Sequence, residues 1–102
     1  MTRIGTFAFA APLWLHPGAD GWHFVTVPQD LSDDIRDLTA GHRRGFGSVR
    51  VAVTVGATAW RTSVFPQSST GCFLLPMKHA VRAAEGLQVD GAVEVTLEIL
   101  DL

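Results

Sequence analysis

Lys78 and Arg82 are the residues whose type and spacing could do chemistry, because they place two positive charges one turn apart at the start of a predicted helix. A cation in the first turn of a helix opposes the helix dipole by ~0.3–1 kcal/mol, and a like charge four residues away adds to this cost. No acidic residue lies near them in the sequence to relieve it. A bound carboxylate or phosphate would do so, and the free N–H groups of a helix start also favour anions.

Arg44 and Ser63 complete the anion pocket that we predict around Lys78 and Arg82. The segment between Asp37 and Glu85 has no acidic residue and carries a charge of +6. A surface of this charge is expected to face an anion. The basic residues of the segment are Arg43, Arg44, Arg50, Arg61, Lys78 and Arg82.

An internal partner is the alternative explanation for these cations. Glu94 or Glu98 of the last predicted strand could neutralise Lys78 and Arg82, so that basic strands simply lie beside acidic ones. Trp22 and Trp60 likewise allow a structural and a ligand-binding interpretation. They are expected in the core or at the mouth of a barrel, and a stacking platform for a base or a sugar is the alternative.

The remaining reactive side chains predict no catalytic site, metal or cofactor. Cys72 is the single cysteine, so no internal disulfide forms, and its apolar neighbours suggest an inert buried thiol. Ser63 has no G-x-S-x-G context that would suggest a nucleophile. The histidines lack the close spacing of a zinc site; they are His16, His23, His42 and His79.

Length and composition are those of one globular domain over residues 1–102. Hydrophobic residues make up 47% of the chain and charged residues 18%. The net charge of −2 argues against a dedicated nucleic-acid binder. No apolar run reaches the ~20 residues that a membrane-spanning helix needs. The start of the chain weakly resembles a signal peptide, but Pro12 and the strand-like spacing of Phe7 and Phe9 favour a first strand, and we expect a cytoplasmic protein.

A β-hairpin is the clearest structural pattern. Valines alternate with other residues from Val49 to Val55, and the alternation resumes at Trp60. A four-residue loop would then pair Val55 with Trp60, Val53 with Thr62 and Val51 with Val64 on the core side. Arg50, Arg61 and Phe65 are expected on the opposite face.

The other expected elements are four strands and two helices. A first strand covers 3–11 and could continue through 13–15, and Asp30 or Ser32 could cap a first helix that Gly41 ends. A second helix follows Pro76 and ends near Glu85, with Met77, Ala80, Val81 and Ala84 as its buried stripe. The remaining strands are expected at 22–27, 72–75 and 93–99. The short, hairpin-linked strands predict a mainly β fold, a small barrel of about six strands capped by two short helices.

Four segments carry a resemblance to a known family: 21–28 (GWHFVTVP), 43–51 (RRGFGSVRV), 62–66 (TSVFP) and 75–82 (LPMKHAVR). Together they resemble a family of small bacterial barrels of unknown function, found alone or fused to a YdeI/OmpD-associated (bacteriocin-protection) domain. The resemblance covers nearly the whole chain and implies a double-split β-barrel, an architecture shared with bacterial transition-state regulators and antitoxins. It implies no established activity. Family members commonly have an aromatic residue where this chain has Cys72.

Three functions follow from these observations. The first is a non-enzymatic module that binds a small anion or a protein partner at its basic face. The second, by analogy of fold alone, is a regulator that binds DNA as a dimer, which the acidic net charge disfavours. The third is a small hydrolase, for which no triad or metal motif is present. A homodimer is compatible with each, because an exposed hairpin edge can pair between subunits.

Overall fold

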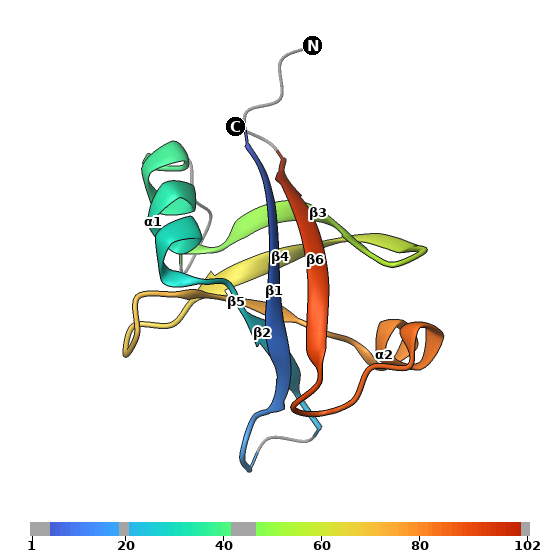
Figure 1. The fold of residues 1–102 in the computed structure, drawn as a ribbon. Coiled ribbons are helices and arrows are strands. Elements are labelled where there is room, and N and C mark those ends of the chain that lie inside the picture. Colours follow the sequence, from blue (N-terminus) through green and yellow to red (C-terminus); the bar gives the residue numbers. More distant parts are fainter. Residues whose placement is uncertain (1–4, 19–20, 42–46, 101–102) are drawn as a thin grey trace.

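The computed structural model describes residues 5–18, 21–41 and 47–100. In these residues six antiparallel strands close into a barrel in the order β1-β2-β5-β4-β3-β6, and two helices lie at opposite sides of it (Figure 1). The predicted mainly β barrel with two helices is therefore confirmed. The elements are β1 (Thr6–Leu15), β2 (His23–Thr26), α1 (Gln29–Leu38), β3 (Val49–Val55), β4 (Thr58–Pro66), β5 (Phe73–Pro76), α2 (His79–Glu85) and β6 (Ala92–Ile99).

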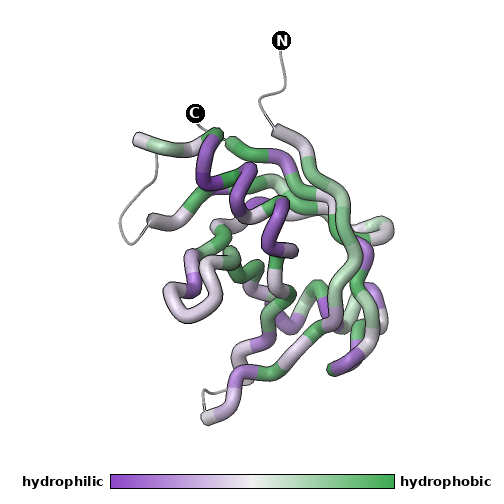
Figure 2. The backbone as a smooth tube through the Cα atoms, turned by 60° about the vertical axis from the view of Figure 1, so that its left-hand side comes forward, coloured by the Kyte–Doolittle hydropathy of each residue, from purple (hydrophilic) through white to green (hydrophobic). Residues whose placement is uncertain are grey.

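The core fills the inside of the barrel with the side chains of alternating strand positions. All four valines of β3 are buried, as predicted, and so are the alternate residues of β6 from Val93 to Ile99. Phe73 is the largest fully buried side chain. Figure 2 shows the resulting contrast between the hydrophobic stretches of the strands and the hydrophilic α1. Because the barrel is packed with side chains, any binding site must lie on its outside or at its openings.

The β3–β4 hairpin forms as predicted, but its predicted register is wrong by two residues. Val55 lies opposite Thr58, so the turn contains only Gly56 and Ala57. Gly56 has a φ of 58°, which suits the first position of a tight two-residue hairpin turn. A shift of two residues keeps each side chain on its predicted face, because the side-chain period of a strand is two. The corrected pairs include Val53 with Trp60, Val51 with Thr62 and Arg50 with Ser63.

The predicted caps of the first helix are also wrong. Pro28 precedes α1, and no side chain caps the helix. Asp30 lies in the first turn and accepts a hydrogen bond from the Leu31 N–H at 2.9 Å. Ser32 is fully buried, and its hydroxyl donates to the Val27 carbonyl oxygen instead.

The second helix is shorter than predicted, and only half of its predicted apolar stripe is buried. Met77 and Val81 are buried, whereas Ala80 and Ala84 are exposed. The helix begins at His79, which places Met77 before it and makes Lys78 its N-cap residue. Gly86 ends it with a φ of 62°, as the sequence predicted.

Two proline residues mark the places where neighbouring strands of the barrel separate. Pro12 lies within β1, which continues to Leu15 and pairs with β2 only over its last three residues. Pro76 ends β5, which pairs with β4 only through Leu74 and Phe73. Proline has no N–H to donate to a ladder. The barrel is thus split between β1 and β2 and again between β4 and β5.

Candidate ligand-binding cleft

An open cleft of about 460 Å³ lies at the split between β4 and β5. Its walls come from four parts of the chain: the start of β2, the strand β4, the end of β5 and the segment that leads into α2. The volume lies within the ~300–1,000 Å³ typical of ligand sites. The lining residues are Gly21, Trp22, His23, Trp60, Arg61, Thr62, Phe65, Pro76, Met77, Lys78, His79 and Arg82.

The structure brings together most of the residues that the sequence singled out. Lys78, Arg82, Trp22 and Trp60 all line the cleft, although they come from segments far apart in the chain. Ser63 is half-buried and is not among the lining residues. Arg44 lies outside the described residues.

Arg61 is a further cation of the cleft that the sequence reasoning did not select. Its alternation placed it on the outer face of the hairpin, away from the core, and the structure confirms that it is exposed. Because no described strand pairs with β4 beyond its split from β5, the side chain of Arg61 at this edge can also line the cleft. The absence of acidic residues between Asp37 and Glu85 was the signal that could have identified it.

Among the residues that the structure describes, Arg82 is held in place by backbone and histidine contacts and not by a carboxylate. Its Nε donates to the Met77 carbonyl oxygen at 3.0 Å, and its Nη1 lies 3.5 Å from Nε2 of His23. Nδ1 of His23 lies 2.6 Å from the Gly21 carbonyl oxygen. These contacts fit a neutral imidazole that donates from Nδ1 and accepts at Nε2. Both contacts leave the charge of Arg82 unneutralised.

The positive charges of the cleft have no acidic partner in the described part of the chain. Neither Arg61, Lys78 nor Arg82 forms an ion pair there. Among the described residues, Lys78 and Arg82 form no hydrogen bond or ion pair with Glu94 or Glu98, the internal partners considered from the sequence. Glu94 and Glu98 belong to β6, which pairs with β1 and β3 and contributes no residue to the cleft.

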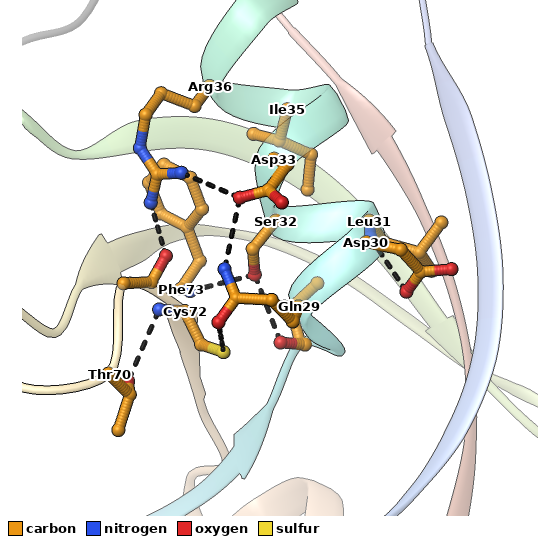
Figure 3. A network of polar contacts seen from close by, with 12 residues as sticks. Gln29, Asp30, Leu31, Ser32, Asp33, Ile35, Arg36, Thr70, Cys72 and Phe73 are labelled. Atoms are coloured by element: carbon orange, nitrogen blue, oxygen red, sulfur yellow. Dashed lines mark hydrogen bonds and ion pairs between the residues drawn. The ribbon is translucent and has the colours of Figure 1, made fainter.

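Arg36 of α1 shows how a structural arginine of this protein is neutralised (Figure 3). Its Nη1 donates to Asp33 Oδ1 at 3.1 Å, its Nη2 donates to the Gly71 carbonyl oxygen, and its guanidinium lies 5.6 Å from the centre of the Phe73 ring. The same network contains the predicted buried thiol, since Cys72 Sγ lies 3.5 Å from Gln29 Oε1. This network fixes α1 to the β4–β5 loop and contributes no residue to the cleft.

Aromatic rings supply the apolar part of the cleft. Trp22 is 55% exposed and stacks on Phe24 with an interplanar angle of 12° and a centroid distance of 6.0 Å. Phe24 in turn contacts Trp14, so Trp22 is supported from behind by other rings. Trp60 is half-buried, and Phe65 is exposed. A flat apolar group could stack on these rings beside the cations.

Outside the cleft, α2 contacts the β3–β4 hairpin. Thr58 Oγ1 donates to Glu85 Oε2 at 2.6 Å, and a Cβ added at Gly56 would collide with the same carboxylate. Glu85 is thus engaged with β4 and is not among the residues that line the cleft.

Neither a metal-binding cluster nor a membrane-spanning helix is found among the described residues. Within residues 5–18, 21–41 and 47–100, no cluster of three or more histidine, cysteine, aspartate or glutamate side chains could hold a metal ion. Neither helix is long and apolar enough to cross a membrane.

Comparison with known proteins agrees with the resemblance seen in the sequence. Residues 9–97 match the model of a family described as a domain of unknown function, DUF1905. The chain belongs to this family. No curated protein matches the chain.

Proposed function

We propose that this protein is a non-enzymatic, cytoplasmic binding module that holds an anionic group, carboxylate or phosphate, together with a flat apolar group in the cleft between β4 and α2. One observation carries the proposal. Three cations without an acidic partner and two tryptophans meet in one cavity of the described structure. An ordinary structural cation of this protein, such as Arg36, has its carboxylate beside it.

Hydrogen bonds to the cations and stacking on the tryptophan rings would be the main favourable contributions to the free energy of binding. A hydrogen bond to a charged group contributes ~1.5–3 kcal/mol, and stacking of a ring on an aromatic side chain contributes ~1–3 kcal/mol. Arg61 and Lys78 are exposed, so salt screens their attraction and reduces their share. Arg82 is half-buried and already oriented by Met77 and His23, so it loses less conformational entropy on binding.

Binding of duplex DNA by a dimer is the less favoured function. A DNA-binding surface needs several cations spread along one continuous face. Here the cations that have no acidic partner among the described residues gather around a cavity, and the net charge of the chain is −2. A ligand that enters a cavity suits this arrangement better than a rod-shaped polyanion.

Thermal-shift and calorimetric titrations with phenyl phosphate test the proposal. This compound joins a dianion to a ring, and inorganic phosphate and benzyl alcohol are the matched probes for each half. We expect phenyl phosphate to raise the melting temperature more than either half, because a ligand that binds only the native state stabilises it. The Arg61→Ala/Lys78→Ala variant should lose this shift, whereas Arg50→Ala, outside the cleft, should retain it. A shift that survives in Arg61→Ala/Lys78→Ala would exclude the cleft as the site.

A further inference from the structure

We propose that the ligand of the cleft is an extended peptide that adds to the free edge of β4 as a new strand and places an acidic group among the cations. This inference rests on the proposed function, because both use the same cleft. It adds a second feature, the backbone of β4, which a small anion would not need.

The strand pairing of the barrel shows which backbone groups of β4 point away from β3, toward the side of β5. Leu100 N–H donates to the Arg50 carbonyl oxygen at 2.9 Å, so Arg50 points its backbone groups toward the β6 side of β3. Neighbouring residues of a strand point their backbone groups in opposite directions. The backbone groups of the odd-numbered residues of β3 therefore point toward β4. Through the pairs Val53–Trp60 and Val51–Thr62, they bond to the even-numbered residues of β4. The backbone groups of the odd-numbered residues of β4 point away from β3; these residues are Ala59, Arg61, Ser63 and Phe65.

The next strand in the barrel leaves these groups without a partner. The ladder between β4 and β5 contains only the pairs Phe65–Leu74 and Pro66–Phe73. If this ladder continued by two residues beyond the pair Phe65–Leu74, Pro76 would lie opposite Ser63. Proline has no N–H to donate to such a pair. In the described part of the chain, no strand pairs with Ala59, Arg61 and Ser63 on the side of β4 that faces β5.

An unpaired strand edge beside a cavity is the arrangement that strand addition requires. Such an edge offers a row of N–H and C=O groups that an extended peptide can pair with. Alternate side chains of the added strand point to opposite faces. One set would point toward the cleft, where Trp22 and Trp60 can receive a ring and Lys78 and Arg82 a carboxylate.

Charge selects an acidic peptide over a second copy of this chain. If the β4 edges of two copies paired antiparallel, Arg61 and the neighbouring Lys78 and Arg82 of both would gather at one seam. Like charges opposite one another across a ladder are destabilising. A peptide with carboxylates at alternate positions brings the opposite charge to the same place.

The test uses the full chain labelled with ¹⁵N and the pentapeptide acetyl-Glu-Val-Glu-Val-Phe with a free carboxylate. We expect the amides of Arg61 and Ser63 to exchange with solvent more slowly when the peptide is bound, because they gain hydrogen bonds. The amides of Trp60 and Thr62 already bond to β3 and should exchange as before. Unchanged exchange at Arg61 and Ser63 under saturating peptide would overturn the proposal.

Three control compounds separate strand addition from anion binding. The same peptide methylated at alternate backbone nitrogens keeps its charges and its ring, and it should bind at least about tenfold more weakly if two hydrogen bonds are lost. A peptide with lysine in place of glutamate should not bind. If phenyl phosphate binds but the methylated and unmethylated peptides bind equally, the strand inference fails and the anion site stands. If neither phenyl phosphate nor the peptide binds, both proposals fail.

Discussion

Pro76 occupies the position of β5 that would pair with Ser63 of β4 if the ladder between the two strands continued. Because Pro76 cannot donate a hydrogen bond, the two strands separate there, and the chain turns away into α2. The cleft lies in the opening that results, and Pro76 is one of its lining residues. The feature that creates the candidate site is thus a missing backbone donor.

Replacing Pro76 by alanine should partly close the cleft. The substitution restores an N–H that can donate to the Ser63 carbonyl oxygen, so the new amide at position 76 should exchange slowly with solvent in an NMR measurement. Binding of phenyl phosphate should weaken several-fold. Pro12→Ala is the matched control, because Pro12 lies at the other split of the barrel and lines no part of the cleft. Unchanged binding in Pro76→Ala, together with a protected amide at 76, would contradict this account of the opening.

Removing the hydroxyl of Ser32 should destabilise the protein. Ser32 Oγ donates to the Val27 carbonyl oxygen and accepts from the Phe73 N–H, each at 3.0 Å, and the side chain is fully buried. Ser32→Ala leaves both groups buried and unpaired, at a cost of about 1–3 kcal/mol in the free energy of unfolding.

Chemical denaturation of Ser32→Ala and of Ser69→Ala measures this effect. Ser69 is exposed in the β4–β5 loop, so its loss should change the unfolding free energy by no more than about 0.5 kcal/mol. Equal stabilities of the two variants would show that the Ser32 hydroxyl does not hold α1 to β5.

Gly56→Ala should be destabilising for two separable reasons. The positive φ of 58° costs an L-residue roughly 1–2 kcal/mol, and the new Cβ would collide with Glu85 and break its hydrogen bond to Thr58. In a Glu85→Ala background the collision is absent and only the backbone cost remains. A double-mutant cycle by thermal or urea unfolding should therefore show a smaller penalty in that background. The same penalty in both backgrounds would mean that Glu85 does not contact the turn.

Tryptophan fluorescence should report occupation of the cleft through Trp60 and Trp22. Trp14 lines no part of the cleft, and its Nε1 donates to Thr26 Oγ1 at 2.9 Å. Phenyl phosphate should therefore change the emission of the Trp14→Phe variant as it does that of the parent protein. The change should be clearly smaller in Trp60→Phe. The reverse pattern would place the ligand on the β1–β2 hairpin and not in the cleft.

The barrel could be predicted from the sequence because its strands alternate clearly and its turns carry glycine and proline. The register of the hairpin could not be predicted, because a shift of two residues leaves the same valines inside the barrel. Only the backbone conformation of Gly56 distinguishes the observed two-residue turn from the predicted four-residue loop. The predicted cap of the first helix was wrong because Ser32, a typical cap residue, hydrogen-bonds instead to Phe73 of β5 and to Val27, just after β2. Tertiary contacts decided that position.

Two of the four residues of the predicted anion pocket, Lys78 and Arg82, line the cleft. They could be predicted because the evidence for them lies within one short segment of the sequence. Lys78 and Arg82 are close in sequence, and the lack of nearby acids already indicated that their charge is not neutralised within their own segment. The place of Arg61 and the open edge of β4 depend on where β5 separates from β4 while it stays paired with β2, and this depends on contacts between distant parts of the chain. Ser63 was predicted as a side-chain ligand, but it is not among the residues that line the cleft.

An NMR titration of the full chain with phenyl phosphate tests the central claim most directly, because it locates the ligand residue by residue. The account predicts saturable shifts of the Trp60 indole N–H and of the backbone signals of Arg61 and Lys78, all with one dissociation constant. The signals of Trp14 and Arg36, outside the cleft, should stay in place. Absence of saturable shifts in the cleft, or shifts centred on Trp14 or Arg36, would contradict the claim that this cleft binds an anionic ligand.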